Sequence, residues 1–319
     1  MCVKTCYNDA VNHEFREERD GSMETIQKID IHAHATAFPQ YVAPRYNGTR
    51  MVCAEDVLGF YEKLNIEKGL LLPLLAPEAH TFTITNEDCK WISDQYPDRF
   101  VWFCTVDPRM GENHPRSDLS YILEYYKSIG AKGVGELTAS LYADDPKMDN
   151  LFYHCAKTGM PVTIHIAPEP DGYYGIVDDP GLPRLERMLK KHPDLLILGH
   201  SQPFWAEMSE YAPEMRNDYP KGKVREGRLP KLLREYGNLH CDLSAGSGAN
   251  ALMRDREYAA RFIEEFADRL YYGCDVCAVS NTHPFPFNDF LDSMRESGEI
   301  SEENYRKIVR ENAVRLLGL

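Results

Sequence analysis

Two histidines near the start of the chain are spaced so that both could bind one metal ion. The segment KIDIHAH, residues 28–34, alternates apolar and polar residues, which is typical of a β-strand. Successive side chains of a strand leave opposite faces, so Asp30, His32 and His34 should share one face, with the two histidines roughly 6.5 Å apart. Histidine pairs with this spacing also occur by chance on exposed strands, so the motif alone leaves both interpretations open.

Four more ionisable residues stand at the C-terminal ends of apolar segments that we predict to be strands. They are Glu136, His165, His200 and Asp275. A single strand histidine such as His165 is more often a hydrogen-bonded core residue than a ligand. Six such residues at strand ends are a stronger signal, because the C-terminal ends of parallel barrel strands meet at one rim. We therefore expect one shared site.

Eight apolar segments alternate with amphipathic ones along the chain. We expect strands at residues 28–34, 69–74, 99–106, 131–137, 161–166, 194–200, 238–244 and 270–275. We expect helices at residues 54–64, 86–92, 119–129, 148–158, 183–192, 229–236, 258–266 and 301–316, with Asn86 and Ser301 as N-caps. This pattern predicts an α/β fold, a closed (β/α)8 TIM barrel. A doubly wound open sheet is the alternative, but no glycine-rich dinucleotide motif follows the first strand.

Composition places limits on the organisation and the partners of the protein. The chain has 319 residues, 43% of them hydrophobic, which allows one large domain with a sizeable core. We predict a single barrel domain at residues 28–319 after a polar N-terminal extension at residues 1–27, which lacks the apolar stretch of a secretory signal. No apolar run is long enough to cross a membrane. The net charge of −14 argues against nucleic acid or an anionic membrane as a partner.

The cysteines indicate a reducing compartment. There are nine, an odd number, and their spacing forms no disulfide framework, so we expect reduced thiols and a cytoplasmic location. Cys274 and Cys277 form a C-x-x-C motif. They lack the helix N-terminus that makes such pairs reactive, so we expect no redox or zinc-knuckle role for them.

Four segments, in this order, resemble the amidohydrolase superfamily. They are DIHAH at 30–34, VTIHI at 162–166, LGHS at 198–201 and YYGCDV at 271–276. The closing stretch ENAVRLL, residues 311–317, resembles the end of the amidohydrolase-2 branch, which includes aminocarboxymuconate-semialdehyde decarboxylase-like and hydroxybenzoate decarboxylase-like enzymes. The resemblance runs from about residue 28 to the C-terminus. It implies the barrel and a metal site, and it leaves the substrate open.

The resemblance also implies roles for individual residues. His32, His34, His165 and Asp275 would bind one divalent ion, usually zinc, and His200 would be a catalytic histidine beside it. Glu136 departs from this single-metal pattern. In TatD-like deoxyribonuclease relatives a glutamate at the end of strand four bridges two metals, and the segment GVGEL resembles that stretch. We expect one ion, with Glu136 either bridging a second ion or holding substrate.

These residue types suit metal-assisted chemistry. Imidazoles and a carboxylate suit zinc and can leave one position open for water, whose pKa the ion lowers to about 7. Asp275 would take a proton from that water and later deliver it to a leaving group, and His200 would polarise a substrate carbonyl. Asp30 would either orient a ligand imidazole or form a buried salt bridge.

Candidate substrate contacts lie on the loops after the strands. Arg45, on the first loop, could bind a carboxylate, as could Arg50. Tyr173 and Tyr174 follow the fifth strand, and Trp205 follows the sixth. These aromatics could form a wall for a flat substrate, although Trp205 could equally pack within the protein.

Three functions remain open at this point. A zinc-dependent hydrolase of an ester, lactone or amide of a small organic acid is the first, favoured slightly by the polar loop at residues 168–183, which indicates an open site. A metal-dependent, non-oxidative decarboxylase of an aromatic or unsaturated acid is the alternative. A barrel that binds a metal or ligand without turnover is the third. We expect a small-molecule substrate and a homodimer.

Overall fold

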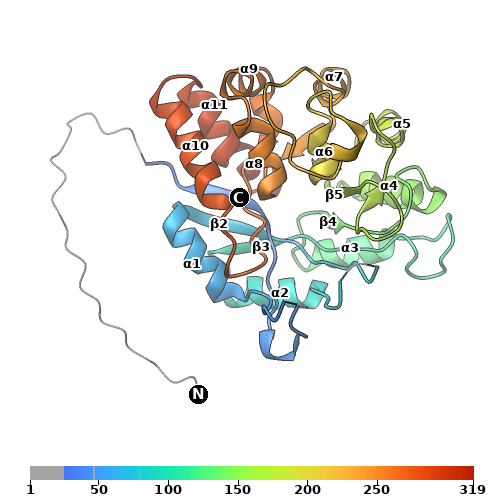
Figure 1. The fold of residues 1–319 in the computed structure, drawn as a ribbon. Coiled ribbons are helices and arrows are strands. Elements are labelled where there is room, and N and C mark those ends of the chain that lie inside the picture. The colour runs from blue at the N-terminus through green and yellow to red at the C-terminus, as the bar shows by residue number, and fades with distance from the viewer. Residues whose placement is uncertain (1–24, 46, 79) are drawn as a thin grey trace, which may run out of the picture.

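Eight parallel strands form a closed barrel in the computed structural model, which describes residues 25–45, 47–78 and 80–319 (Figure 1). They are β1 (Lys28–Ala33), β2 (Ile66–Leu71), β3 (Phe100–Trp102), β4 (Val134–Leu137), β5 (Val162–Ala167), β7 (Ile197–His200), β8 (Leu239–Asp242) and β9 (Leu270–Tyr271). The short β6 (Ile176–Val177) pairs with β5 outside this path. Single bridges from Cys104 to Val134 and from Ala33 to Val276 join the sheets β1-β2-β3 and β4-β5-β7-β8-β9 at both edges. The predicted TIM barrel is confirmed.

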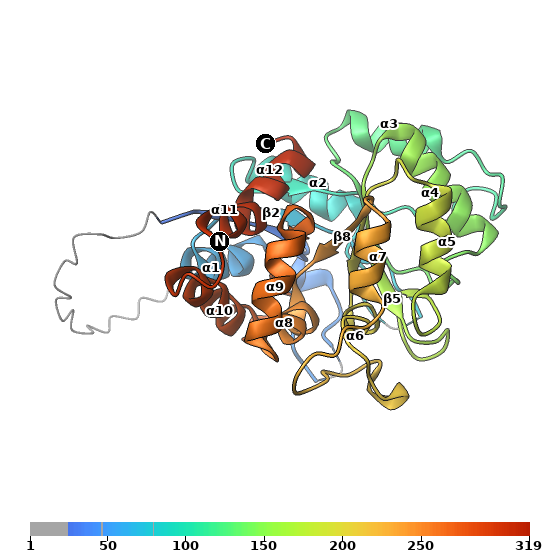
Figure 2. The same ribbon diagram turned by 90° about the horizontal axis from the view of Figure 1, so that it is seen from above.

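Helices surround the strands (Figure 2). They are α1 (Ala54–Leu64), α2 (Asn86–Gln95), α3 (Ser120–Ser128), α4 (Pro146–Thr158), α5 (Pro183–Lys191), α6 (Gln202–Ala206), α7 (Leu229–Glu235), α8 (Ala245–Met253), α9 (Arg256–Phe266), α10 (Pro284–Glu296), α11 (Glu302–Arg306) and α12 (Asn312–Leu317). Every predicted helix is present, and α6, α8 and α10 were not predicted. The sequence of α8, AGSGANALM, has no apolar periodicity, and α10 begins with PFPF, where prolines are more typical of a loop.

The two predicted helix caps have different outcomes. Ser301 is the N-cap of α11, and its side chain accepts a backbone N–H of the first turn. The N-cap of α2 is Thr85 and not Asn86. Asn86 instead exchanges two hydrogen bonds with the backbone of Thr105, because it lies one position further, on the side of the helix that faces the barrel.

A β-bulge in β1 changes which of its side chains share a face. Asp30 pairs with Gly69 of β2, and Ala33 pairs with Leu71, so β1 has one residue more than β2 over this interval. Such a bulge breaks the strict alternation of the strand and is common beside active sites.

Asp30 consequently lies on a different face from the two histidines. Its side chain accepts a hydrogen bond from Tyr61 of helix α1 at 2.8 Å, and others from the backbone N–H groups of His32 and Cys274. Burial raises the pKa of Asp30 to about 7. Both predicted roles of Asp30 are wrong, because its carboxyl group is bonded to Tyr61 of the helix layer and, among the residues that the structure describes, it forms no salt bridge and no side-chain hydrogen bond to a ligand imidazole.

Apolar side chains fill the barrel interior beneath the site. The interior cluster collects residues from strands on different sides of the barrel, namely Ile29, Ile31, Leu70, Leu72, Phe103, Leu198 and Tyr271. Ala313 and Leu317 of α12 belong to the same cluster, so the last helix packs against the interior. A larger cluster lies between the strands and the surrounding helices.

The barrel reaches back to Ile26, which is buried and whose carbonyl oxygen accepts a hydrogen bond from Asn65. Residues 1–24 of the predicted extension lie outside the described residues, and the domain boundary stays a prediction. No helix in the described ranges is long and apolar enough to cross a membrane. All seven cysteines of the described part are free thiols, Cys274 and Cys277 included.

Candidate active site

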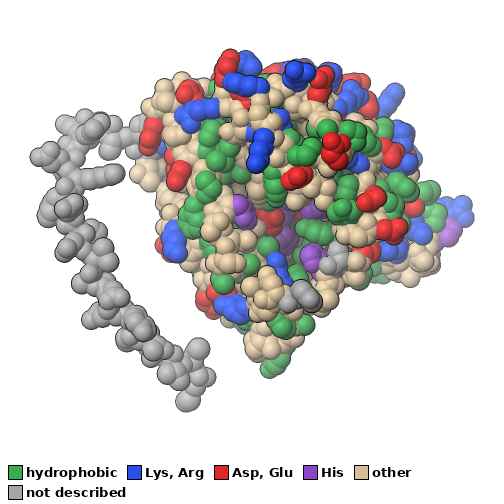
Figure 3. All heavy atoms as spheres, viewed as in Figure 1, with side chains coloured by type: hydrophobic (Ala, Val, Ile, Leu, Met, Phe, Trp, Pro, Cys, Tyr) green, Lys and Arg blue, Asp and Glu red, His purple; other side chains and the backbone are tan. Residues whose placement is uncertain are grey.

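The face seen in Figure 1 contains a hollow with histidine and acidic side chains at its floor (Figure 3). His32 Nε2 and His34 Nε2 lie 3.0 Å apart. Glu136 Oε2 lies 3.8 Å from the first nitrogen and 3.4 Å from the second. Asp275 Oδ1 lies 3.7 and 3.5 Å from the same two nitrogens. We call these four atoms the ligand group.

The ligand group fits a divalent metal ion. Four tetrahedral ligands at ~2.1 Å from zinc lie roughly 3.4 Å from one another, and the distances between the two nitrogens and from each of them to the two carboxylates are 3.0–3.8 Å. His32, His34 and Glu136 are buried, whereas the Asp275 side chain is 21% exposed. Nitrogen lone pairs and carboxylate oxygens turned toward one point are the donors that such an ion prefers.

The outer nitrogen of each histidine is held by a hydrogen bond. His34 Nδ1 lies 2.9 Å from the carbonyl oxygen of Leu72, which can only accept, so Nδ1 carries the proton. His32 Nδ1 lies 2.6 Å from Asp242 Oδ2. Both contacts fix the ring orientation and turn Nε2 toward the ligand group, and a neutral ring that carries its proton on Nδ1 has Nε2 free to bind an ion.

Asp242, at the end of β8, is a functional residue that the sequence reasoning missed. Its carboxylate is fully buried and lies 2.6 Å from His32 and 3.4 Å from His200. Burial alone would raise the pKa of Asp242, but these two imidazoles hold it below its usual value. The signal was present, because Asp242 also stands at the end of a predicted strand.

His165 and His200 lie beside the ligand group, His165 next to Glu136 and His200 next to His32. His165 Nδ1 is 2.6 Å from Glu136 Oε1, while His200 lies 4.5 Å from His32 between ring centroids. His200 Nε2 is 3.9 Å from Asp275 Oδ2. Burial lowers the pKa of His200 to about 4, so its ring is neutral at physiological pH. The structure thus brings all six strand-end residues together, with Glu136 in the middle.

Glu136 contacts both halves of the site. Burial would raise the pKa of its carboxyl group, but the neighbouring His165 holds that pKa well below its usual value. A separation of 2.6 Å to His165 is a hydrogen-bond distance, and ligands of one ion lie farther apart. One oxygen of Glu136 thus faces His34, and the other lies at hydrogen-bond distance from His165.

Arg45, Tyr173 and Tyr174, three of the predicted substrate contacts, have different surroundings in the structure. Arg45 lies over the ring of Phe82, and its Nη2 donates to the carbonyl oxygen of Cys277, two residues after Asp275. Tyr174, which we had considered beside Tyr173, packs against His165 with ring centroids 4.2 Å apart and the two rings tilted by 36°. Tyr173 is half-buried.

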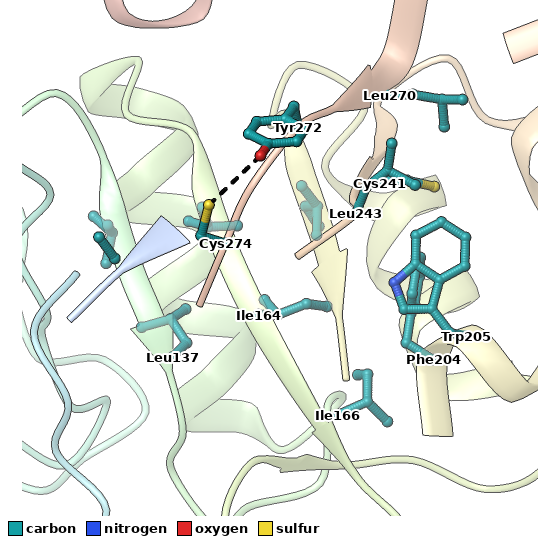
Figure 4. Packing of buried hydrophobic residues seen from close by; sticks show 14 of the residues in the cluster. Leu137, Ile164, Ile166, Phe204, Trp205, Cys241, Leu243, Leu270, Tyr272 and Cys274 are labelled. Carbon is teal, nitrogen blue, oxygen red and sulfur yellow. Dashed lines mark hydrogen bonds between the residues drawn. The ribbon is translucent and has the colours of Figure 1, made fainter. Parts of the chain in front are cut away.

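Trp205 is buried in the core, and the prediction that it forms part of a substrate wall is wrong. It is 3% exposed, and its Nε1 donates to the backbone oxygen of Asp242 at 3.0 Å. Figure 4 shows Trp205 beside Phe204 within the apolar core. The short helix α6 turns back directly after His200 and carries Trp205 toward Phe262 of α9, away from the rim.

The chain belongs to the amidohydrolase family. The Amidohydro_2 family model, described as amidohydrolase, matches residues 29–319, almost the whole barrel. This confirms the family resemblance seen in the sequence. A comparison with curated protein sequences gave no match.

Solved structures share the fold at low sequence identity. The 5-carboxyvanillate decarboxylase from Sphingomonas paucimobilis has a TM-score of 0.60 and 17% identity, over 92% of this chain and 100% of that one. The 2,6-dihydroxybenzoate decarboxylase from Rhizobium has a TM-score of 0.59 and 17% identity, over 92% and 99%. A probable 2-pyrone-4,6-dicarboxylic acid hydrolase from Acinetobacter baumannii has a TM-score of 0.58 and 16% identity, over 92% and 100%.

Proposed function

We propose that the protein is a divalent-metal-dependent, non-oxidative decarboxylase of a small aromatic or unsaturated carboxylic acid. The observation that carries this proposal is the set of flat side chains and one arginine beside the ligand group. Tyr174 packs against His165, and the Arg45 guanidinium lies 5.4 Å from the centroid of the Phe82 ring. Such surroundings suit a flat, conjugated acid. Two of the structural relatives are named as 5-carboxyvanillate and 2,6-dihydroxybenzoate decarboxylases, which supports the same choice.

The loop at residues 168–183, whose polar sequence favours an open hydrolytic site, is ordered against the barrel. Its segment β6 pairs with β5, and Gly175 N donates to the carbonyl oxygen of Thr138. Tyr174 directly precedes these two anchors, and its ring lies beside that of His165. An aromatic side chain fixed at this position supports decarboxylation, which needs a flat pocket with little water.

Each residue of the site would have a separate role in this reaction. An ion held by the ligand group supplies, when bound, positive charge for a substrate carboxylate or neighbouring oxygen. The bond between the carboxylate and the substrate carbon that carries it breaks, and the carboxylate leaves as carbon dioxide. The electron pair of that bond stays on the substrate carbon, and Asp275 Oδ2 would deliver a proton to this carbon. Neutral His200, 3.9 Å from this oxygen, would hold a substrate oxygen beside it. Arg45 would hold the far side of the substrate.

We propose zinc as the metal and one ion per chain. Two imidazoles and two carboxylates suit zinc, although manganese accepts similar ligands. The hydrogen-bond distance between His165 and Glu136 supports one ion, because it leaves His165 paired with a carboxylate oxygen.

Hydrolysis of an ester, lactone or amide is the second candidate. The observation that favours it is the position of Glu136, whose two oxygens face His34 and His165 respectively. A second ion beside His165 and His200 would make Glu136 a bridging ligand, an arrangement suited to activating water. The relative named as a probable 2-pyrone-4,6-dicarboxylic acid hydrolase agrees with this candidate.

An assay with zinc- or manganese-loaded protein separates the candidates. We expect carbon dioxide release from hydroxybenzoates or related acids, and a loss of roughly 10²–10⁴-fold in the Asp275→Asn variant. Turnover of lactones or aryl esters would favour hydrolysis. Bound metal without either turnover would favour a non-catalytic binding barrel.

We propose a small molecule as the partner of this site, in a cytoplasmic homodimer. The negative charge of the chain supports a partner other than nucleic acid. Size-exclusion chromatography with light scattering tests the dimer.

A further inference from the structure

We propose that His80 and Arg45 form a polar pair that receives a second anionic oxygen of the substrate, away from the ligand group, and that His80 determines specificity for acids carrying one. The inference rests on the proposed substrate site. It adds a residue that neither the strand-end pattern nor the family resemblance singled out.

The pair is recognised by two buried nitrogen atoms. Arg45 Nε and His80 Nε2 are both shielded from solvent, and neither has a hydrogen-bond partner among the described residues. An unpaired buried polar group is costly, so such groups are rare unless a ligand or water completes them. Arg45 Nη2 is already used, because it donates to the carbonyl oxygen of Cys277 at 3.1 Å. Its Nε is left for a ligand.

Both side chains border the candidate active site. The His80 ring lies 4.6 Å from that of Tyr174, which in turn lies 4.2 Å from His165. It also lies 5.0 Å from Phe82, the ring over which the Arg45 guanidinium is placed. The two polar groups thus flank one aromatic surface that leads to the ligand group.

The electrostatic surroundings agree with this position. Burial lowers the pKa of His80, and the charge of Arg45 lowers it further, while Glu136 acts in the opposite direction. His80 is therefore near both charges and neutral at physiological pH. A neutral imidazole can donate from Nε2 without burying a second positive charge.

The loop that carries His80 is fixed at several points. Leu74 and Ile84 exchange two backbone hydrogen bonds of 2.9 and 3.0 Å, which close the loop at its base. Thr138 Oγ1, just beyond strand β4, donates to the carbonyl oxygen of Leu75 at 2.7 Å. His80 N donates to the carbonyl oxygen of Ala76. The imidazole is thus presented from a loop that is tied to the strand carrying Glu136.

The ligand that fits is a planar acid with two anionic groups. One group would meet the ligand group, and the other would accept hydrogen bonds from Arg45 Nε and His80 Nε2. A carboxylate and a phenolate offer the same acceptor oxygen. Phe82 and Tyr174 favour a flat molecule between the two groups.

Binding of benzoate, benzene-1,3-dicarboxylate and 3-hydroxybenzoate to the metal-loaded full chain tests the proposal by calorimetry. We expect the wild type to bind at least one of the two substituted acids about tenfold more tightly than benzoate. His80→Phe keeps an aromatic ring but removes both nitrogens, and it should abolish this preference. His80→Gln should retain part of the preference. His114→Phe, at an exposed histidine, is the matched control and should behave as wild type.

A His80→Phe variant that keeps the full preference would overturn the proposal, and so would a wild type that binds the three acids equally or not at all. The comparison between the two substituted acids identifies the acceptor as a carboxylate or a phenolate. Because binding is measured without turnover, an absence of decarboxylation with a His80-dependent preference contradicts the proposed reaction and not the polar pair.

Discussion

His32 Nδ1 and Asp242 Oδ2 lie 2.6 Å apart in the fully buried floor of the site. This contact fixes the imidazole in the orientation that turns Nε2 toward His34 and Asp275. Asp242 is itself held, since its other oxygen accepts the backbone N–H of Ser244. We therefore expect the metal affinity of His32 to depend on a residue that does not belong to the ligand group.

We predict that Asp242→Asn weakens metal binding by roughly 10- to 100-fold, because a neutral amide supports the imidazole less well than a carboxylate. Competition with a chromophoric chelator measures the affinity. Asp268→Asn, which changes an exposed aspartate of equal charge, should leave it unchanged. Equal affinities of the Asp242 variant and the wild type would contradict the role given to Asp242.

The number of ions is decided by elemental analysis. We expect one zinc per chain in the wild type and a reduced content in Glu136→Gln, because the variant loses one charged ligand without changing the side-chain shape. Two ions in the wild type, with one lost in the variant, would instead show that Glu136 bridges two metals.

Gly69 allows the Tyr61 hydroxyl to reach Asp30. A Cβ atom at residue 69 would lie 1.8 Å from Tyr61 Oη, so Gly69→Ala should displace the tyrosine and leave a buried carboxyl group with one partner fewer. We predict a loss of about 2–4 kcal/mol in the free energy of unfolding, measured with denaturant. Gly237→Ala is the control, because nothing lies within 4 Å of a Cβ there. Similar stabilities of the two variants would disprove the steric argument.

Asp178 should make stability depend on pH. It is 1% exposed, and burial raises its pKa to about 6, above the unfolded value of 3.8. The folded state therefore binds a proton more readily than the unfolded state, and stability from this group increases as the pH falls. We predict that the wild type gains about 1 kcal/mol relative to Asp178→Asn between pH 7 and pH 5. A difference that is constant with pH, or that decreases, would contradict the raised pKa.

The barrel and the strand-end residues were predictable because both follow from repeated local patterns. Apolar runs that alternate with amphipathic helices define the strands, and a strand end fixes the rim on which its last side chain lies. The same rule applied to residues 238–244 also points to Asp242, so this residue was predictable from the sequence as well. The pairing of Glu136 with His165 needed distances that no spacing supplies.

Other features could not be predicted from local pattern. The bulge in β1 moves Asp30 away from the histidines, and nothing in the alternation of KIDIHAH reveals the extra residue. Trp205 follows a strand end, as a rim residue would, but the direction of the turn in α6 carries it into the core. His80 lies in a loop without periodicity, and only the folded loop brings it near Arg45.

The bridge between Ala33 and Val276 joins the first strand to the last part of the barrel wall, and few backbone contacts reinforce this seam. His34 comes from one side of the seam and Asp275 from the other, so an ion bound by both acts as a staple across it. We expect removal of the metal by a chelator to increase amide hydrogen exchange first at Asp275 N, which donates to the carbonyl oxygen of His32 at 2.7 Å. Unchanged protection of this amide from hydrogen exchange in the metal-free protein would mean that the contact between the two strands does not depend on the ion.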